Sequence, residues 1–155
     1  MAQVAVLFVC YGNICRSPLA EAAFRLEAQR AGLDAFADSA GTSDWHVGAP
    51  PDPRSQDVAL LHGIDIRLLR GRQVEPADFT RFTHIIAMDR GNLAALHAMR
   101  PRGTTASVSL ILDHVPGREG TSVADPYNFS IQAFDATWAE VAAGAAGFVK
   151  ALQNK

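Results

Sequence analysis

The fold of this chain is decided by residues 4–18, which read VAVLFVCYGNICRSP. The apolar run over residues 4–9 predicts a strand that is buried on both faces. Ser17-Pro18 predicts the start of a helix, because proline is favoured at the first helical position. A buried strand, a short loop and a helix start in this order favour an α/β fold, in which such a loop commonly binds a ligand.

The loop between this strand and helix carries residues suited to binding an anion. Cys10 and Arg16 stand six residues apart, so a curled loop can present a thiol and a guanidinium to one small object. Backbone N–H groups that curl into a helix start form an anion nest, and the helix dipole adds positive charge, which favours the thiolate of Cys10 as a nucleophile. Arg16 offers a planar fork for two phosphoryl oxygens, and Ser17 can donate its hydroxyl to the sulfur. Gly12 and Asn13 suit a loop this tight.

The composition is that of an ordinary globular protein of 155 residues, enough for a single domain over residues 1–155. A net charge of -2 gives no general attraction to nucleic acid or to anionic membranes. The sequence shows neither an apolar run long enough to span a membrane nor a secretory signal pattern. Its two cysteines fit reducing conditions better than a disulfide framework, so we expect a cytoplasmic protein.

Helices and strands alternate along the rest of the chain, which predicts a doubly wound α/β domain with helices on both faces of a parallel sheet. Further helices are expected over residues 18–30, 53–63, 90–99 and 134–153, and further strands over residues 35–40, 83–88 and 106–112. Asp52 and Asp89 fit the N-cap positions of the second and third helices. Residues 113–130 have no periodic pattern, and loops of that length are usually functional or mobile.

Three features outside the first loop are less specific. Trp45 lies in the Gly- and Pro-rich residues 41–53, where it either packs on the surface, the favoured interpretation, or forms a pocket wall. His62 fits the last turn of the second helix, where the helix dipole favours a histidine. Residues 67–72 contain three arginines, which are interpreted as a solvated edge.

The sequence CYGNICRSP at residues 10–18 resembles the phosphate-binding loop of the low-molecular-weight protein tyrosine phosphatases. A bare Cys-x5-Arg spacing is a weak signal, but the strand, loop and helix context agrees and further motifs of the family recur in the same order. These motifs are SAGT at 39–42 with Trp45, PDPR at 51–54, HGI at 62–64, RQ at 72–73 and DPY at 125–127. The resemblance covers essentially the whole chain.

The resemblance implies a four-stranded sheet of order 2-1-3-4 and hydrolysis of phosphotyrosine through a cysteinyl-phosphate intermediate. Cys10 would be the nucleophile and Arg16 would bind the phosphoryl group. Asp125 would protonate the leaving phenolate and then activate water, although Asp-Pro by itself is a common turn. The implied substrate is a phosphotyrosine protein and the product is inorganic phosphate. We expect a monomer without metal, cofactor or nucleic-acid partner.

Other positions take supporting roles by the same resemblance. Phosphate binding is implied for the remaining loop residues, which are Tyr11, Gly12, Asn13, Ile14, Cys15 and Ser17. Trp45 and Tyr127 would flank the substrate ring. Ser39 and His62 would hydrogen-bond to Asn13 and so hold the loop in shape.

The sequence leaves some alternatives open. Arsenate reduction uses the same loop in related proteins but needs cysteines further downstream, and none follows Cys15. A non-catalytic phosphotyrosine-binding module would be expected to have lost Cys10 or Asp125. Cys15 either packs beneath the loop or forms a disulfide with Cys10 on oxidation. Tyr11 and Asn128 depart from residues common in the family, so the pocket shape and the substrate preference are open.

Overall fold

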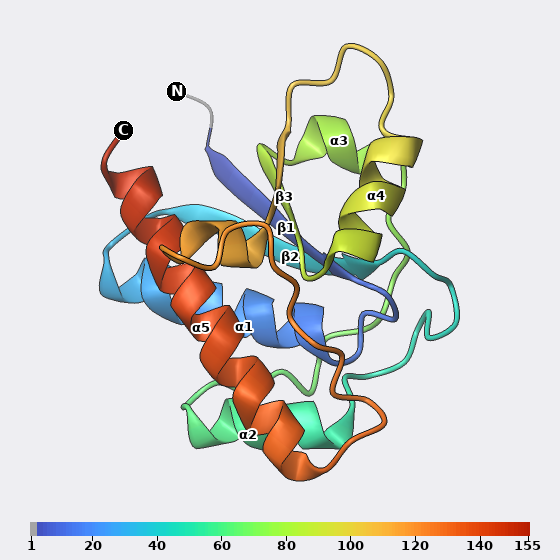
Figure 1. The fold of residues 1–155 in the computed structure, drawn as a ribbon, viewed down its shortest axis with the longest axis vertical. Coiled ribbons are helices and arrows are strands. Elements are labelled where there is room, and N and C mark those ends of the chain that lie inside the picture. The colour runs from blue at the N-terminus through green and yellow to red at the C-terminus, as the bar shows by residue number, and fades with distance from the viewer. Residues whose placement is uncertain (1–2) are drawn as a thin grey trace.

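The computed structural model describes residues 3–155 and contains a sheet of four parallel strands in the order β2-β1-β3-β4 (Figure 1). The strands are β1 (Val4–Cys10), β2 (Ala35–Gly41), β3 (His84–Ala87) and β4 (Ser107–Leu110). β1 pairs with β2 along its whole length and with β3 over residues 6–9, so it is an internal strand. The parallel sheet and its strand order confirm the expected fold class.

Helices lie on both faces of the sheet, as Figure 1 shows. α1 (Arg16–Arg30) and the long α5 (Ile131–Gln153) cover one face, and α2 (Pro53–Leu61) packs against both of them. α3 (Asp78–Arg81) and α4 (Arg90–Met99) lie on the opposite face. Within the described residues, no helix combines the length and the apolar character that a membrane crossing requires.

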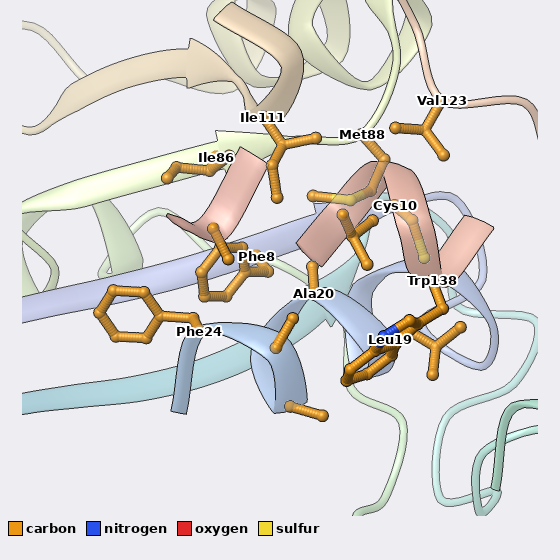
Figure 2. Close-up of a cluster of buried hydrophobic side chains, with 14 of the residues drawn as sticks. Phe8, Cys10, Leu19, Ala20, Phe24, Ile86, Met88, Ile111, Val123 and Trp138 are labelled. Atoms are coloured by element: carbon orange, nitrogen blue, oxygen red, sulfur yellow. The ribbon is translucent and has the colours of Figure 1, made fainter. Parts of the chain in front are cut away.

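The two faces of β1 explain why helices cover both sides of the sheet. Side chains alternate between the faces of a strand. Val6 and Phe8 belong to the apolar cluster under α1 and α5, whereas Leu7 and Val9 belong to the cluster under α3 and α4. Figure 2 shows Cys10 among the core side chains of the first cluster, so the loop that follows β1 starts from a packed position.

The end of the fourth strand differs from the expectation. A strand is predicted over residues 106–112, but β4 ends at Leu110 and a 3-10 helix, η1 (Ile111–His114), follows it. The reason is the close approach of α5. A Cβ on Gly147 would overlap the carbonyl oxygen of His114, so the backbone of η1 lies directly on this helix.

Other boundaries shift by a few residues. α1 begins slightly earlier than expected, at Arg16, and α5 begins slightly earlier, at Ile131. α3, a single turn, is not predicted from the sequence at all. Asp52 and Asp89 are N-caps as predicted, since each side chain accepts a hydrogen bond from a backbone N–H of the first turn, at 2.9 and 2.7 Å.

Candidate active site

The loop over residues 10–17 turns the carbonyl groups of Tyr11 and Ile14 outward. The carbonyl oxygen of Tyr11 accepts a hydrogen bond from the Ser43 N–H at 3.0 Å. That of Ile14 accepts one from the Asp52 N–H at 2.8 Å. In a trans peptide the N–H points away from the preceding carbonyl, so the N–H groups that follow face the inside of the loop. Together with the N-terminus of α1 they form a nest for an anion of phosphate size.

Asn13 holds this curl from inside the loop. Its φ of 59° lies in the left-handed region, which asparagine tolerates better than most residues. Its side-chain N–H groups donate to the hydroxyls of Ser17 and Ser39 at 2.8 and 3.0 Å. Its side-chain oxygen accepts a hydrogen bond from the backbone N–H of Arg72 at 3.0 Å. The amide therefore joins the loop to β2, through Ser39, and to the backbone of Arg72.

His62 is not part of this network, and its predicted hydrogen bond to Asn13 is wrong. It lies at the end of α2 and stacks on Trp138, with ring centroids 4.5 Å apart. The backbone of Arg72 contacts Asn13 instead. The Arg72 guanidinium also binds the buried carboxylate of Asp78 at 3.0 Å, so this arginine does not belong to a solvated edge as predicted.

Cys10 lies on the floor of the loop and is 2% exposed. Its Sγ accepts a hydrogen bond from the Asn13 N–H at 3.2 Å and lies 3.0 Å from the hydroxyl oxygen of Ser17. Because this oxygen already accepts a hydrogen bond from Asn13, the hydroxyl proton is free to be donated to the sulfur. The sulfur therefore has two hydrogen-bond donors aimed at it, which fix its position for a role as nucleophile.

Arg16 is held with one side of its guanidinium free. Its side chain is 3% exposed, and Nη1 donates to the carboxylate of Asp89 at 2.6 Å and to the carbonyl oxygen of Val123 at 3.0 Å. These two bonds use both Nη1 hydrogens, so the Nε and Nη2 hydrogens remain for an anion. Burial acts to lower the pKa of Arg16, but the negative charges of Cys10 and Asp89 raise it above its ordinary value.

A cavity of about 380 Å³ opens above Cys10 and Arg16. Aromatic side chains line it, among them Tyr11, Trp45 and Tyr127. Trp45 is 74% exposed, and its ring meets that of Tyr11 edge-on, with centroids 5.5 Å apart. Trp45 thus lines the cavity, and the favoured interpretation that it packs on the surface is wrong.

Asp125 lies at the mouth of the cavity, in the segment that leads into α5. Its side chain is 50% exposed, and Oδ1 accepts a hydrogen bond from the Tyr127 N–H at 3.1 Å. The other oxygen, Oδ2, is 3.6 Å from Nη2 of Arg16. A carboxyl oxygen therefore borders the same cavity as the Cys10 sulfur and the free side of the Arg16 guanidinium.

The model of the family described as low molecular weight phosphotyrosine protein phosphatase matches residues 5–155. The chain belongs to this family. It is 40% identical over 153 residues to the low molecular weight phosphotyrosine protein phosphatase of Schizosaccharomyces pombe, and the match covers 97% of each chain. The chain is accordingly a protein tyrosine phosphatase, a phosphoric monoester hydrolase that acts on phosphotyrosine.

Solved structures agree with this assignment. The protein tyrosine phosphatase of Entamoeba histolytica superposes with a TM-score of 0.92 at 30% identity, over 98% of both chains. A Drosophila protein named arginine phosphatase superposes with a TM-score of 0.89 at 32% identity, over 95% of this chain and 96% of the other. The phosphatase fold is therefore shared along almost the full chain.

The phosphatase carries its second cysteine beneath the loop. Cys15 is 3% exposed, and both cysteines are free thiols. Burial is the main cause that raises the pKa of Cys15, and the negative charge of Asp52 adds to it, so this thiol stays neutral. Cys15 packs beneath the loop in this structure, and a disulfide with Cys10 on oxidation stays a prediction.

Sequence reasoning assigned no role at the site to three residues of the phosphatase. Asp89 is predicted only as a helix cap, yet its second carboxylate oxygen binds Arg16. His46 lines the cavity beside Gly12, where an added Cβ would lie 3.0 Å from the imidazole ring. Arg54 reaches the segment that carries Asp125. For Asp89, the available signal was its position directly after a buried strand, at the edge of the sheet where the first loop lies.

Proposed function

We propose that the phosphatase hydrolyses phosphotyrosine in two steps through a phosphate ester on Cys10. In the first step the Cys10 sulfur attacks phosphorus, the bond from phosphorus to the tyrosine oxygen breaks, and Asp125 in its acid form gives its proton to that oxygen. A single observation carries the proposal. The sulfur of Cys10, the free side of the Arg16 guanidinium and the carboxyl of Asp125 border one cavity.

Arg16 and the loop amides bind the phosphoryl group during this step. Nε and Nη2 of Arg16 can hold two oxygens as a fork, because Asp89 and Val123 occupy only Nη1. The N–H groups of Gly12 and Cys15, which face the inside of the loop, are directed toward the same oxygens. Donors that are already in place stabilise the transition state without a cost of reorganisation.

The second step reverses the roles of the same groups. Asp125, now ionised, accepts a proton from a water molecule, and the oxygen of this water attacks phosphorus. The bond from phosphorus to sulfur breaks and the electron pair returns to Cys10. The Ser17 hydroxyl, 3.0 Å from the sulfur, stabilises the departing thiolate, and inorganic phosphate is the product.

The walls of the cavity support an aryl ester as the substrate. Tyr11, Trp45 and Tyr127 offer aromatic faces to a ring above the phosphate nest. An alkyl phosphate, such as phosphoserine, leaves these faces uncovered. Phosphoarginine is the second candidate substrate, since a structural relative is named arginine phosphatase and a guanidinium is also planar.

Initial rates on phosphotyrosine, phosphoserine and phosphoarginine test the substrate. We expect phosphotyrosine to have the highest kcat/KM, and a higher kcat/KM on phosphoarginine would contradict this preference. Cys10→Ser should bind inorganic phosphate but not turn over, whereas Asp125→Asn should lose roughly 100-fold or more on phosphotyrosine. Mass spectrometry of acid-quenched wild type should find phosphate on Cys10. Turnover of Cys10→Ser near the wild-type rate would refute the covalent route.

Arsenate reduction is the alternative reaction. The sequence has two cysteines, both at this loop, so a cascade that resolves a thiol adduct with downstream cysteines lacks its residues. Arsenate should therefore inhibit the phosphatase competitively and should not be reduced in the presence of a thiol reductant. Formation of arsenite at a rate that depends on the enzyme would contradict this assignment.

We further propose that residues 1–155 act as one phosphatase domain, as a monomer in the cytoplasm. Every residue assigned to the reaction comes from one chain, and two free cysteines at the site support a reducing compartment. The expected partners are phosphotyrosine proteins rather than nucleic acid or membranes, consistent with a net charge of -2. Analytical ultracentrifugation should give a single species of monomer mass, and a dimer would contradict the proposal.

A further inference from the structure

The chain contains two Asp-x-Arg turns with the same local geometry. In the first, the backbone N–H and Nε of Arg54 donate to Oδ1 of Asp52 at 2.9 and 3.0 Å, and Nη2 donates to Oδ2 at 2.9 Å. In the second, Arg67 makes the same three contacts to Asp65 at 2.9, 3.0 and 2.8 Å. The Asp65–Arg67 pair is exposed, and ion pairs of that kind contribute little to stability. The two turns differ in what the arginine contacts beyond its own aspartate.

Arg54 uses its remaining N–H groups on the segment that carries Asp125. Nη1 donates to the carbonyl oxygen of Phe129 and Nη2 to that of Tyr127, both at 2.9 Å. The guanidinium carbon also lies 4.3 Å from the ring centroid of Phe134, at the start of α5. Hydrogen bonds from a charged donor are roughly twice as strong as those between neutral groups. Arg54 therefore binds two carbonyl oxygens of the segment that follows Asp125, those of Tyr127 and Phe129.

Residues 124–130, here called the acid segment, have few other anchors. The Val123 N–H donates to the Met88 carbonyl at 2.8 Å just before the segment, and α5 begins just after it. Between these points the remaining described hydrogen bonds are local, such as that from the Phe129 N–H to the Pro126 carbonyl at 2.9 Å. A second cavity, of about 230 Å³, is lined by the acid segment and by α5, so packing against this helix is incomplete.

Asp52, the partner of Arg54, is in turn bound to the phosphate-binding loop. The Asp52 N–H donates to the carbonyl oxygen of Ile14 at 2.8 Å, which is one of the bonds that turn the loop carbonyls outward. Burial opposes ionisation of Asp52, but the hydrogen bonds from Arg54 outweigh it and lower the pKa of this carboxyl. Asp52 and Arg54 thus form a charged link from the loop that holds phosphate to the acid segment.

We propose that Arg54 is a positioning residue, which fixes where the Asp125 carboxyl lies relative to the phosphate nest. The inference rests on the proposed function, because it assumes that Asp125 protonates the leaving group. Oδ1 of Asp125 is occupied by the Tyr127 N–H, and the carbonyl of the same Tyr127 is held by Arg54. Loss of Arg54 frees this turn, and proton transfer is sensitive to displacements of about 1 Å.

Leaving-group dependence separates positioning from a general structural role. Arg54→Met keeps the length of the side chain and removes its donors, and Arg67→Met makes the same change in the matched turn. The substrates are phenyl phosphate, which needs protonation as phosphotyrosine does, and 4-nitrophenyl phosphate, whose phenolate leaves readily. We expect Arg54→Met to lower kcat/KM roughly 10- to 100-fold on phenyl phosphate but only by about a few-fold on 4-nitrophenyl phosphate. Arg67→Met should match the wild type on both.

Inhibition by inorganic phosphate shows whether the nest itself survives. The inhibition constant of Arg54→Met should stay close to that of the wild type, because Arg16 and the loop amides are unchanged. Arg54→Lys offers a second variant if the methionine variant does not fold, since its single ammonium can bind only part of the pair of carbonyls. We expect it to lose less than Arg54→Met, with the same bias against phenyl phosphate.

Combining Arg54→Met with Asp125→Asn completes the test. If Arg54 acts through Asp125, the double variant should be about as slow on phenyl phosphate as Asp125→Asn alone. Equal losses of Arg54→Met on both substrates, or fully additive losses in the double variant, would overturn the positioning role. If Asp125→Asn itself shows no bias against phenyl phosphate, then the acid assignment fails and the role of Arg54 falls with it. A bias in Asp125→Asn without one in Arg54→Met rejects the Arg54 inference alone.

Discussion

Asp89→Asn is the substitution that most directly tests how Arg16 is held. Asp89 uses its two carboxylate oxygens separately. Oδ1 caps α4 by accepting the Asn92 N–H at 2.7 Å, and Oδ2 accepts Nη1 of Arg16 at 2.6 Å. Asparagine is as good an N-cap as aspartate, so the change leaves the cap in place and removes the charge that faces the guanidinium.

The size of the effect follows from the burial of the pair. Removing one partner of a fully buried ion pair costs about 3–5 kcal/mol. Here Arg16 is 3% exposed but Asp89 is 26% exposed, and the Val123 carbonyl still accepts one Nη1 hydrogen. We therefore expect a loss of about 2 kcal/mol, which in a chain of this length lowers the melting temperature by roughly 4–8 °C. With the fork less firmly held, kcat/KM on phenyl phosphate should fall roughly tenfold or more.

Urea unfolding and inhibition by inorganic phosphate together test whether Asp89 holds Arg16 in place. Phosphate should bind less tightly to Asp89→Asn, because the free side of the Arg16 guanidinium is no longer fixed toward the nest. Asp113→Asn is the control, since Asp113 lies outside the residues that line the catalytic cavity. Its two carboxylate oxygens accept the N–H groups of Leu110 and Gly120, at 2.9 and 2.8 Å, and an amide can accept only one of them through its single oxygen. The substitution should alter stability without altering phosphate affinity. An Asp89→Asn enzyme with wild-type phosphate affinity and kcat/KM would refute the reasoning.

Three further outcomes are expected. Cys15→Ser should keep most of its activity but recover less activity than the wild type when peroxide treatment is followed by dithiothreitol. The reason is that no neighbouring thiol remains to form a disulfide with the oxidised Cys10. Equal recovery of the two enzymes would show that Cys15 only packs beneath the loop. Gly147→Ala should lower the free energy of unfolding in urea by about 2 kcal/mol, because the added Cβ would overlap the His114 carbonyl. Alanine by itself favours a helix more than glycine does, so a gain in stability would contradict this packing. Burial lowers the pKa of His114 and Asp113 only partly offsets this, so the unfolded chain takes up the proton first and stability falls as pH drops below about 6.5. The decline should be shallower in His114→Gln, and identical declines would exclude His114 as the cause.

Features of the fold that depend on neighbouring residues could be predicted from the sequence. The doubly buried strand β1, the loop after it and the caps at Asp52 and Asp89 each follow from a pattern within a few residues. The proposed phosphate nest is of the same kind, because residues 10–17 supply both the proposed nucleophile, Cys10, and the guanidinium of Arg16. Chemistry that is local in sequence can be inferred before any packing is known.

Errors arose where a distant element changed the environment of a residue. His62 ends α2 as predicted, but its ring stacks on Trp138 of α5 instead of bonding to Asn13, and no local pattern reveals this contact. The usual burial of tryptophan predicts that Trp45 packs, yet Trp45 is 74% exposed and lines the cavity, where it meets Tyr11 of the first loop. The end of β4 depends on the glycine face of α5 in the same way. Each error reflects a contact between segments far apart in the chain.

The two Asp-x-Arg turns show what a local sequence pattern cannot predict. Asp52 with Arg54 and Asp65 with Arg67 have the same residues, the same spacing and nearly the same hydrogen-bond lengths, so a local reading assigns them the same role. Only Arg54 has carbonyl oxygens of the acid segment within reach, because α2 begins beside the phosphate-binding loop. A local motif of this kind fixes the arginine on its own aspartate, and the fold determines whether the guanidinium also binds groups from other parts of the chain. The difference in leaving-group dependence between Arg54→Met and Arg67→Met is therefore a measure of what tertiary structure adds to an identical sequence feature.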